Sequence, residues 1–227
     1  MFDFLAKATT NSWDENVFQL TTSGVMTVIA AIIVLIVVAI LLRPKKEKAL
    51  TYSTKQLVFS ALAMALSLVT SFFKFLELPM GGSITLFSMF FITLIGYWYG
   101  AKIGVITAIA YGLLQFVIDP VFYTPVQMIV DYPLAFGALG LSGIFSNKKN
   151  GLIKGYITGV LGRYFFSFLS GLIFFASYAE GSGMSAPVYS LTYNGMYIIP
   201  EAIITVILLV VPSISRALTH VKTMITE

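Results

Sequence analysis

The sequence predicts an all-α membrane protein, in which one compact helical bundle carries an additional helix at its amino terminus. Hydrophobic residues make up 58% of the 227 residues and charged residues only 11%, against roughly 45 to 50% and 25% in a soluble domain. The apolar residues also gather in seven stretches that approach the ~20 residues a helix needs to cross a hydrocarbon core. This composition excludes an ordinary soluble globular protein.

The first predicted span is the uninterrupted apolar run 25–42, which ends at the basic run 43–48. It lacks the basic start of a cleaved signal peptide and is too long for the apolar region of one, so we interpret it as a retained signal anchor. The other six spans follow with short connections. They are predicted at about 56–73, 84–99, 101–118, 126–145, 155–177 and 193–212.

The loops on one side of these seven spans carry most of the lysines and arginines, including the run 43–48, Lys102, Lys148 and Lys149. Loops rich in lysine and arginine stay in the cytoplasm. The amino terminus is therefore predicted outside and the carboxyl terminus inside. The resulting organisation is an extracellular tail 1–24, the additional transmembrane helix 25–42, a basic cytoplasmic linker 43–52, a six-helix bundle 53–218 and a cytoplasmic tail 219–227.

Several functional classes are excluded by what the sequence lacks. It has no cysteine and a single histidine, which excludes disulfides, thiolate nucleophiles and metal sites built from cysteine or several histidines. No phosphate-binding loop or dinucleotide motif is present. We therefore expect no cofactor, no metal and no nucleic acid, and a pump of this kind would need a partner that supplies energy.

Three ionisable residues fall inside the predicted spans, where an unpaired charge costs several kcal/mol. Arg163 and Glu201 both reach the middle of the bilayer on consecutive antiparallel helices, so we expect them to form a structural ion pair. Asp131 lies near the outer end of its helix, where no basic residue is an obvious partner. We interpret Asp131 as an unpaired functional carboxylate.

Aromatic and amide side chains are predicted at the same depth as Asp131. With the glycine-containing loop 79–83 they favour a small, flat ligand that is cationic or carries amide groups, because rings stack on such a ligand and a carboxylate offsets its charge. The alternative is that these rings form the ordinary aromatic belt of a membrane protein, which leaves Asp131 unexplained. The residues are Tyr111, Gln115, Phe175, Tyr189 and Asn194.

A second motif, Gly140-Leu141-Ser142-Gly143, matches the G-x-S-G sequence of intramembrane serine proteases. Their serine needs a base on a nearby span, whereas the single histidine, His220, follows the last predicted span. We interpret Gly140 and Gly143 as packing residues. An intramembrane hydrolase that uses Ser142 remains an alternative.

Five motifs occur in a fixed order: PMGGS at 79–83, YGLLQ at 111–115, DYPLAF at 131–136, SGLIFF at 170–175, and YSLTYNG at 189–195 leading to Pro200-Glu201. In this order and spacing they resemble the thiamine-specific substrate-binding (S) components of the energy-coupling factor (ECF) vitamin transporters, over about residues 53–218.

The resemblance implies a six-helix bundle, not an enzyme, that binds thiamine under loops on the outer side of a bacterial plasma membrane. It also implies that an Ala-x3-Ala surface, here Ala61 and Ala65, docks a transmembrane coupling protein driven by two cytosolic ATPases. The alternatives are an S component for another vitamin or a thiamine precursor, and a structural membrane protein. The site residues implied are Asp131, Tyr132, Tyr111, Phe175, Tyr189, Asn194 and Gly82.

Overall fold

The computed structural model describes residues 6–10, 16–23, 26, 52–78 and 82–226. Apart from Met26, the predicted additional span 25–42 lies outside the described residues, as does the linker up to residue 51. The chain divides into two compact units. One consists of Met1–Thr51 and Phe168–Leu191, the other of Tyr52–Ser167 and Thr192–Glu227.

In the first unit, a β-hairpin occupies the stretch predicted as an extracellular tail. Strand β1 (Ala6–Thr10) pairs antiparallel with β2 (Asn16–Leu20), with Ala6 opposite Leu20. The same unit contains the last turns of α7 (Gly151–Phe174), the short 3-10 helix η5 (Ala176–Ala179) and the first turns of α8 (Ala186–Val210).

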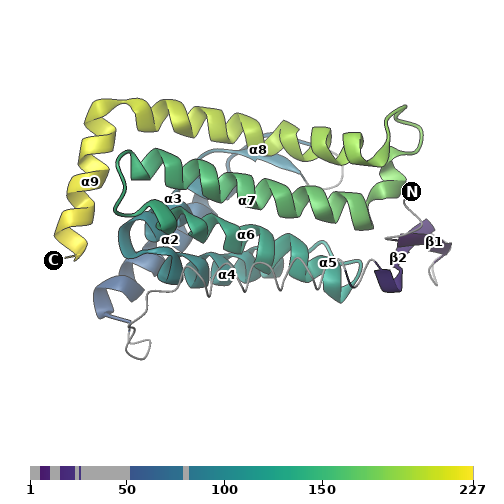
Figure 1. Cartoon of the computed structure of the whole chain (residues 1–227), viewed down its shortest axis with the longest axis horizontal. Coiled ribbons are helices and arrows are strands. Elements are labelled where there is room, and N and C mark those ends of the chain that lie inside the picture. The colour runs from purple at the N-terminus through teal and green to yellow at the C-terminus, as the bar shows by residue number, and fades with distance from the viewer. Residues whose placement is uncertain (1–5, 11–15, 24–25, 27–51, 79–81, 227) are drawn as a thin grey trace. The chain divides into compact units, whose positions relative to one another are not determined.

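The second unit is helical, with one small hairpin of β3 (Lys74–Glu77) and β4 (Ser83–Thr85). In Figure 1, α4 and α6 run side by side within it. Gly100 alone joins α3 to α4, at a φ of +90° that favours glycine. The helices are α2 (Thr54–Ser71), α3 (Ser88–Tyr99), α4 (Ala101–Ile118), α5 (Pro125–Ile129), the π-helix η3 (Val130–Leu134), α6 (Ala135–Gly137), the 3-10 helix η4 (Ala138–Phe145), most of α7 and α8, and α9 (Pro212–Thr226).

Within the described residues, five helical segments are long and apolar enough to cross a membrane: Thr54–Ser71, Ala101–Ile118, Pro125–Phe145, Gly151–Phe174 and Ala186–Val210. The shorter apolar helix Ser88–Tyr99 corresponds to a sixth predicted span. The prediction of a helical, multi-pass membrane fold is confirmed. The prediction that helix begins near residue 84 is wrong, because residues 83–85 pair with β3 instead.

The predicted tail 219–227 is helical through Thr226 and belongs to α9, which runs steeply across the direction of α8 in Figure 1. Pro212 starts α9, since a missing N–H costs nothing in a first turn. Trp98 Nε1 donates to the carbonyl of Leu218 at 3.2 Å. Lys222 Nζ donates to Ser146 Oγ at 2.9 Å, and burial lowers the pKa of Lys222 below its ordinary value. These contacts fix α9 across one end of the bundle.

The centre of the second unit is packed backbone against backbone. A Cβ added at Gly140 would lie 2.2 Å from the Val105 nitrogen, and one at Gly143 would lie 2.1 Å from the Ala101 nitrogen. Only glycine allows α4 and η4 to approach this closely. The interpretation of Gly140 and Gly143 as packing residues is confirmed.

Candidate substrate-binding site

Asp131 and Tyr132 lie on an irregular stretch of helix. Thr124 caps the start of α5, where its hydroxyl accepts from the Gln127 N–H at 3.1 Å. The helix then widens into the π-helix η3, which contains Pro133. Proline has no N–H to donate to the preceding turn, and single π-turns inside helices are frequent at functional sites. The backbone thus marks the segment that carries Asp131.

Gln127 is the polar partner that the sequence interpretation missed. Its Nε2 donates to Asp131 Oδ2 at 2.5 Å and to the Val121 carbonyl at 3.2 Å, while its Oε1 accepts from the Tyr123 N–H at 3.0 Å. The interpretation of Asp131 as unpaired is therefore wrong. The signal was available, because residues four apart on a helix share a face.

Tyr132 holds the turn between α4 and α5. Its hydroxyl donates to the Asp119 carbonyl and accepts from the Val121 N–H, both at 2.8 Å. Its ring meets Phe116 edge-on with centroids 5.0 Å apart. Because its hydroxyl is already occupied, Tyr132 positions the turn beside Asp131.

Tyr111 lies in the interior, with none of its surface exposed. Its hydroxyl accepts from Gln115 Nε2 at 2.5 Å, and its ring meets Phe136 edge-on at 5.4 Å. The Arg163 guanidinium lies over the Phe136 ring, 4.2 Å from the centroid. Tyr111, Phe136 and Arg163 form one aromatic and cationic cluster behind the π-helix.

The predicted ion pair between Arg163 and Glu201 is wrong, since no such pair forms within the part of the chain that the structure describes. Glu201 is 3% exposed. Its carboxylate accepts from Thr85 Oγ1 at 2.7 Å, from Ser88 Oγ at 3.1 Å and from the Met89 N–H at 2.8 Å.

These donors lie at or beside the start of α3, where a helix attracts negative charge. The residue before α3, Phe87, has a φ of 61° and supplies no side-chain cap. Glu201 therefore caps α3 from α8, 112 residues away from Met89 along the chain. No local sequence pattern predicts a helix cap from a residue so far away along the chain.

Gly82 and Asn194 are both held at α8. The Gly82 N–H donates to the Tyr193 hydroxyl at 2.8 Å, and a Cβ at Gly82 would lie 2.6 Å from the same oxygen. Asn194 Nδ2 donates to the Ser167 carbonyl at 3.2 Å, and Asn194 Oδ1 accepts from the Tyr197 hydroxyl at 2.6 Å. Tyr193 and Tyr197 are supporting residues that the motifs alone did not single out.

Phe175 and Tyr189 belong to the first unit. The Phe175 ring stacks on Tyr178 with centroids 6.1 Å apart. The Tyr189 N–H donates to the Ser185 carbonyl at 2.8 Å as α8 begins. The other predicted site residues, Asp131, Tyr132, Tyr111, Gly82 and Asn194, belong to the second unit.

Ser142, the candidate nucleophile, is fully buried in η4, and its hydroxyl donates to the Thr93 carbonyl at 2.7 Å. His220 lies on α9. A nucleophile needs an adjacent base and an open approach for its substrate. Ser142 has neither among the described residues, so the geometry does not support the hydrolase alternative.

Comparison with known proteins gives consistent matches. The chain matches the model of the thiamine transporter protein family over residues 57–221. Thiamine transporter ThiT of Bacillus subtilis is 37% identical over 166 residues, which cover 67% of this chain and 84% of the relative. Thiamine transporter ThiT of Lacticaseibacillus paracasei is 32% identical over 96 residues, which cover 37% of this chain and 47% of the relative.

Among solved structures, ThiT from Listeria monocytogenes superimposes with a TM-score of 0.53 at 27% identity. The match covers 70% of this chain and 94% of that chain. The family model alone spans more than half of the sequence. This multi-pass membrane protein therefore belongs to the thiamine transporter protein family.

Proposed function

We propose that this chain captures thiamine outside the cell and delivers it through an ATP-driven transporter of the ECF type. The observation that carries the proposal is the Asp131 carboxylate, set on a π-helical turn beside an aromatic cluster, in a chain of the thiamine transporter family. Thiamine joins a permanently cationic thiazolium to a flat aminopyrimidine. A carboxylate and stacked rings are the groups that attract such a molecule.

Each proposed contact follows from side-chain chemistry. Asp131 offsets the thiazolium charge, and Asn194, an amide with both donors and an acceptor, fixes the aminopyrimidine. The resemblance assigns ring contacts to Tyr111, Phe175 and Tyr189. Gln127 and Tyr132 act indirectly, because they hold the turn on which Asp131 lies.

Calorimetric titration of the detergent-purified chain with thiamine tests the proposal. We expect one site, and a loss of affinity of about tenfold or more in Asp131→Asn, which corresponds to about 1.4 kcal/mol. Asp119→Asn is the matched control, because the Asp119 carboxylate is 69% exposed on the neighbouring turn. It should leave thiamine binding unchanged.

A neutral thiamine analogue separates charge from shape. Asp131→Asn should weaken binding of the neutral analogue far less than binding of thiamine, and an equal loss for both ligands would refute the charge argument. Riboflavin and biotin are titrated in parallel. Binding of either vitamin in place of thiamine would favour the alternative of an S component for another vitamin. The absence of measurable binding for every ligand would favour a structural protein.

The coupling partner belongs to the same proposal. Ala61 and Ala65 lie exposed on α2 among apolar side chains such as Leu57, Val58 and Leu62, which are 56%, 57% and 52% exposed. Small residues in an apolar strip allow close approach of a second helix. By resemblance, this strip docks the coupling protein on which two cytosolic ATPases act.

Bulky substitution on α2 tests the docking surface separately from thiamine binding. Ala61→Trp should leave the thiamine affinity unchanged and abolish co-purification with a coupling protein and its ATPases in a reconstituted complex. Ile207→Trp, at a position on α8 that is 64% exposed, is the control and should retain the complex. Retention of the complex by Ala61→Trp would refute the assignment.

A further inference from the structure

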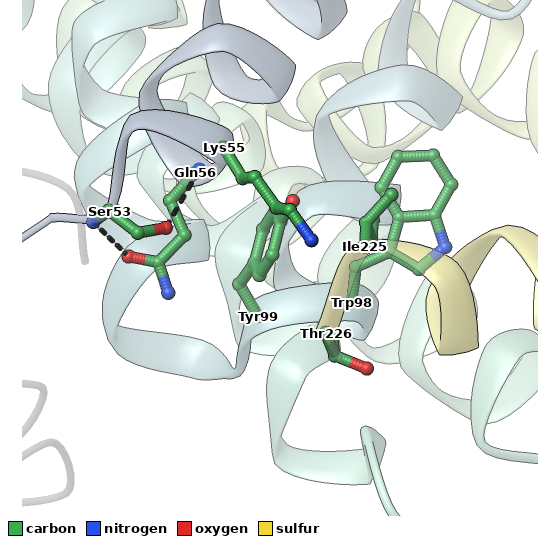
Figure 2. A pocket seen from close by; sticks show the side chains of 7 residues that line it. All are labelled: Ser53, Lys55, Gln56, Trp98, Tyr99, Ile225 and Thr226. Carbon is green, nitrogen blue, oxygen red and sulfur yellow. Dashed lines mark hydrogen bonds between the residues drawn. The ribbon is translucent and has the colours of Figure 1, made fainter.

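A pocket of about 400 Å³ lies at the end of the second unit where α2 begins and where α3 and α9 end. Figure 2 shows its lining side chains. It is far from Asp131 along the fold, because the whole of α4 runs between Tyr99 and the turn at Asp119. The lining residues are Ser53, Lys55, Gln56, Trp98, Tyr99, Ile225 and Thr226.

The lining presents hydrogen-bond donors and one positive charge, that of Lys55. Ser53 and Gln56 cap α2 reciprocally, so their acceptor oxygens are occupied: Ser53 Oγ accepts from the Gln56 N–H at 3.2 Å, and Gln56 Oε1 accepts from the Ser53 N–H at 3.0 Å. The Gln56 NH₂ and the Ser53 O–H remain as donors. The first turn of α2 contains no acidic residue, and a helix start itself favours an anion.

The hydroxyl of Tyr99 is a further donor at this pocket. Its oxygen is buried and has no hydrogen-bond partner among the described residues, and the same holds for Tyr52, directly before Ser53. Buried hydroxyls are normally paired. An anionic oxygen that entered beside Lys55 would supply the acceptor that Tyr99 needs.

Among the described residues of this unit, the charged side chains nearest to the lining along the chain are basic. Lys102 lies in the first turn of α4, and Lys222 lies on α9. The carboxylates described in the same unit lie elsewhere in the fold: Glu77 on β3, Asp119 after α4, Asp131 on η3 and Glu201 at the start of α3. These basic side chains, with Lys55 in the lining, favour an anionic ligand over a cationic one.

The membrane setting points to a lipid as the source of the anion. Directly after the pocket residues, α2 exposes Leu57 and Val58 within a segment apolar enough to span a membrane. Trp98 and Tyr99 are the residue types that occupy the headgroup layer. A ligand that combines a phosphate with acyl chains suits donors that lie at the end of a membrane-spanning segment.

We propose that this pocket binds the phosphate headgroup of an anionic phospholipid, with Lys55 as its charge partner and Tyr99 and Gln56 as neutral donors. The assignment is independent of thiamine. Anionic lipid would stabilise the junction of α2, α3 and α9 at the membrane surface.

The test compares thermal unfolding of the full chain in nanodiscs of phosphatidylcholine with and without phosphatidylglycerol. Phosphatidylglycerol should raise the midpoint, because a ligand that binds the folded state stabilises it. Titration with short-chain phosphatidylglycerol should show about fivefold weaker binding in Lys55→Gln, the effect of one basic group at a lipid surface. Lys149→Gln, an exposed lysine outside the pocket, should bind as the parent does.

Tyr99→Phe removes one oxygen atom and provides a second variant should Lys55→Gln fold poorly. It should weaken phosphatidylglycerol binding and leave the affinity for thiamine unchanged. Equal losses of phosphatidylglycerol affinity in Lys55→Gln and Lys149→Gln would show that both lysines act through general surface charge, and would refute the site. Protection by inorganic phosphate at matched concentration would identify a free-anion site and overturn the lipid assignment, as would equal midpoints in the two nanodiscs.

Discussion

The turn that carries Asp131 and the packed centre that carries Ser142 use polar residues in opposite ways. In the centre, glycines bring helix backbones into contact, and the Ser142 hydroxyl donates its hydrogen bond to the Thr93 carbonyl. At the turn, the helix changes from α to π, and polar side chains hold an irregular loop around a half-buried carboxylate. A polar residue inside a membrane bundle is thus a functional candidate where other polar side chains surround it, and a packing element where neighbouring helix backbones close over it.

The largest expected effect comes from breaking the packed centre with Gly143→Ala. The added Cβ would lie 2.1 Å from the Ala101 nitrogen and 2.3 Å from the Gly100 carbonyl carbon. Both are backbone atoms that no rotamer change can move, so we expect a loss of about 3 kcal/mol or more in the free energy of unfolding.

Gly195→Ala makes the same change where the nearest atom is a flexible side-chain carbon, Ile199 Cδ1, at 3.3 Å. Its effect should stay below about 1 kcal/mol. Thermal unfolding in detergent compares the two variants. Similar midpoints for Gly143→Ala and the parent would show that α4 and η4 can separate.

The next largest effect is expected from Glu201→Ala. This change removes the carboxylate acceptor of the Thr85 hydroxyl, the Ser88 hydroxyl and the Met89 N–H inside the bundle. Buried donors without a partner cost roughly 1 to 3 kcal/mol each when water cannot reach them, and we expect a total loss of about 3 kcal/mol. Glu201→Gln keeps an acceptor for Met89 and should lose about half as much. Equal losses in unfolding measurements would refute the capping role.

The fold could be predicted where an apolar run of spanning length is flanked by residues that end helices. Helix α4 has the predicted bounds 101–118, because Gly100 and Asp119 flank an apolar run. The predicted tail 219–227 begins inside α9, because this helix of 15 residues is too short to be detected as a membrane span. The start of α3 was misplaced, because a short strand with apolar residues resembles the end of a span.

The candidate site could be predicted in its residue types and not in its contacts. The motif at residues 131–136 identified Asp131 and Tyr132, and the spacing of four residues would have paired Gln127 with Asp131. The environment of Glu201 depends on a tertiary contact between α8 and the start of α3. Charge and predicted depth in the membrane favour a pair between Glu201 and Arg163, but the Arg163 guanidinium instead lies over the Phe136 ring.

A smaller effect, confined to the turn, is expected from Tyr132→Phe. The change removes the hydroxyl that bridges the Asp119 carbonyl and the Val121 N–H. Stability should fall by about 1 kcal/mol, the net value of such hydrogen bonds. The affinity for thiamine should fall about fivefold, because the turn beside Asp131 loosens.

Tyr99→Phe, the same substitution at the last residue of α3, should leave thiamine affinity unchanged. Stopped-flow dissociation rates add a second readout, since a loosened turn should release thiamine faster. Tyr132→Phe with the parent affinity and release rate would show that Asp131 is positioned without this bridge.

The smallest effect is expected from Ser142→Ala, which decides between the two interpretations of the G-x-S-G motif. The Cβ is retained and only the hydroxyl that donates to Thr93 is lost, so stability should change by less than about 1.5 kcal/mol. Thiamine affinity should not change, because Ser142 is fully buried in η4, away from the turn. An intramembrane hydrolase would lose all activity on the same substitution while keeping its fold.

The packing interpretation of Ser142 also predicts that this residue is coupled to Gly96, which it contacts. A Cβ at Gly96 would lie 2.1 Å from Ser142 Oγ and 2.8 Å from the Gly140 carbonyl oxygen. Ser142→Ala should therefore relieve part of the cost of Gly96→Ala, and the remaining clash with the backbone oxygen should keep the double variant less stable than the parent. Strict additivity of the two substitutions in unfolding measurements would mean that Ser142 and Gly96 do not share the contact, because residues that touch couple and distant ones add.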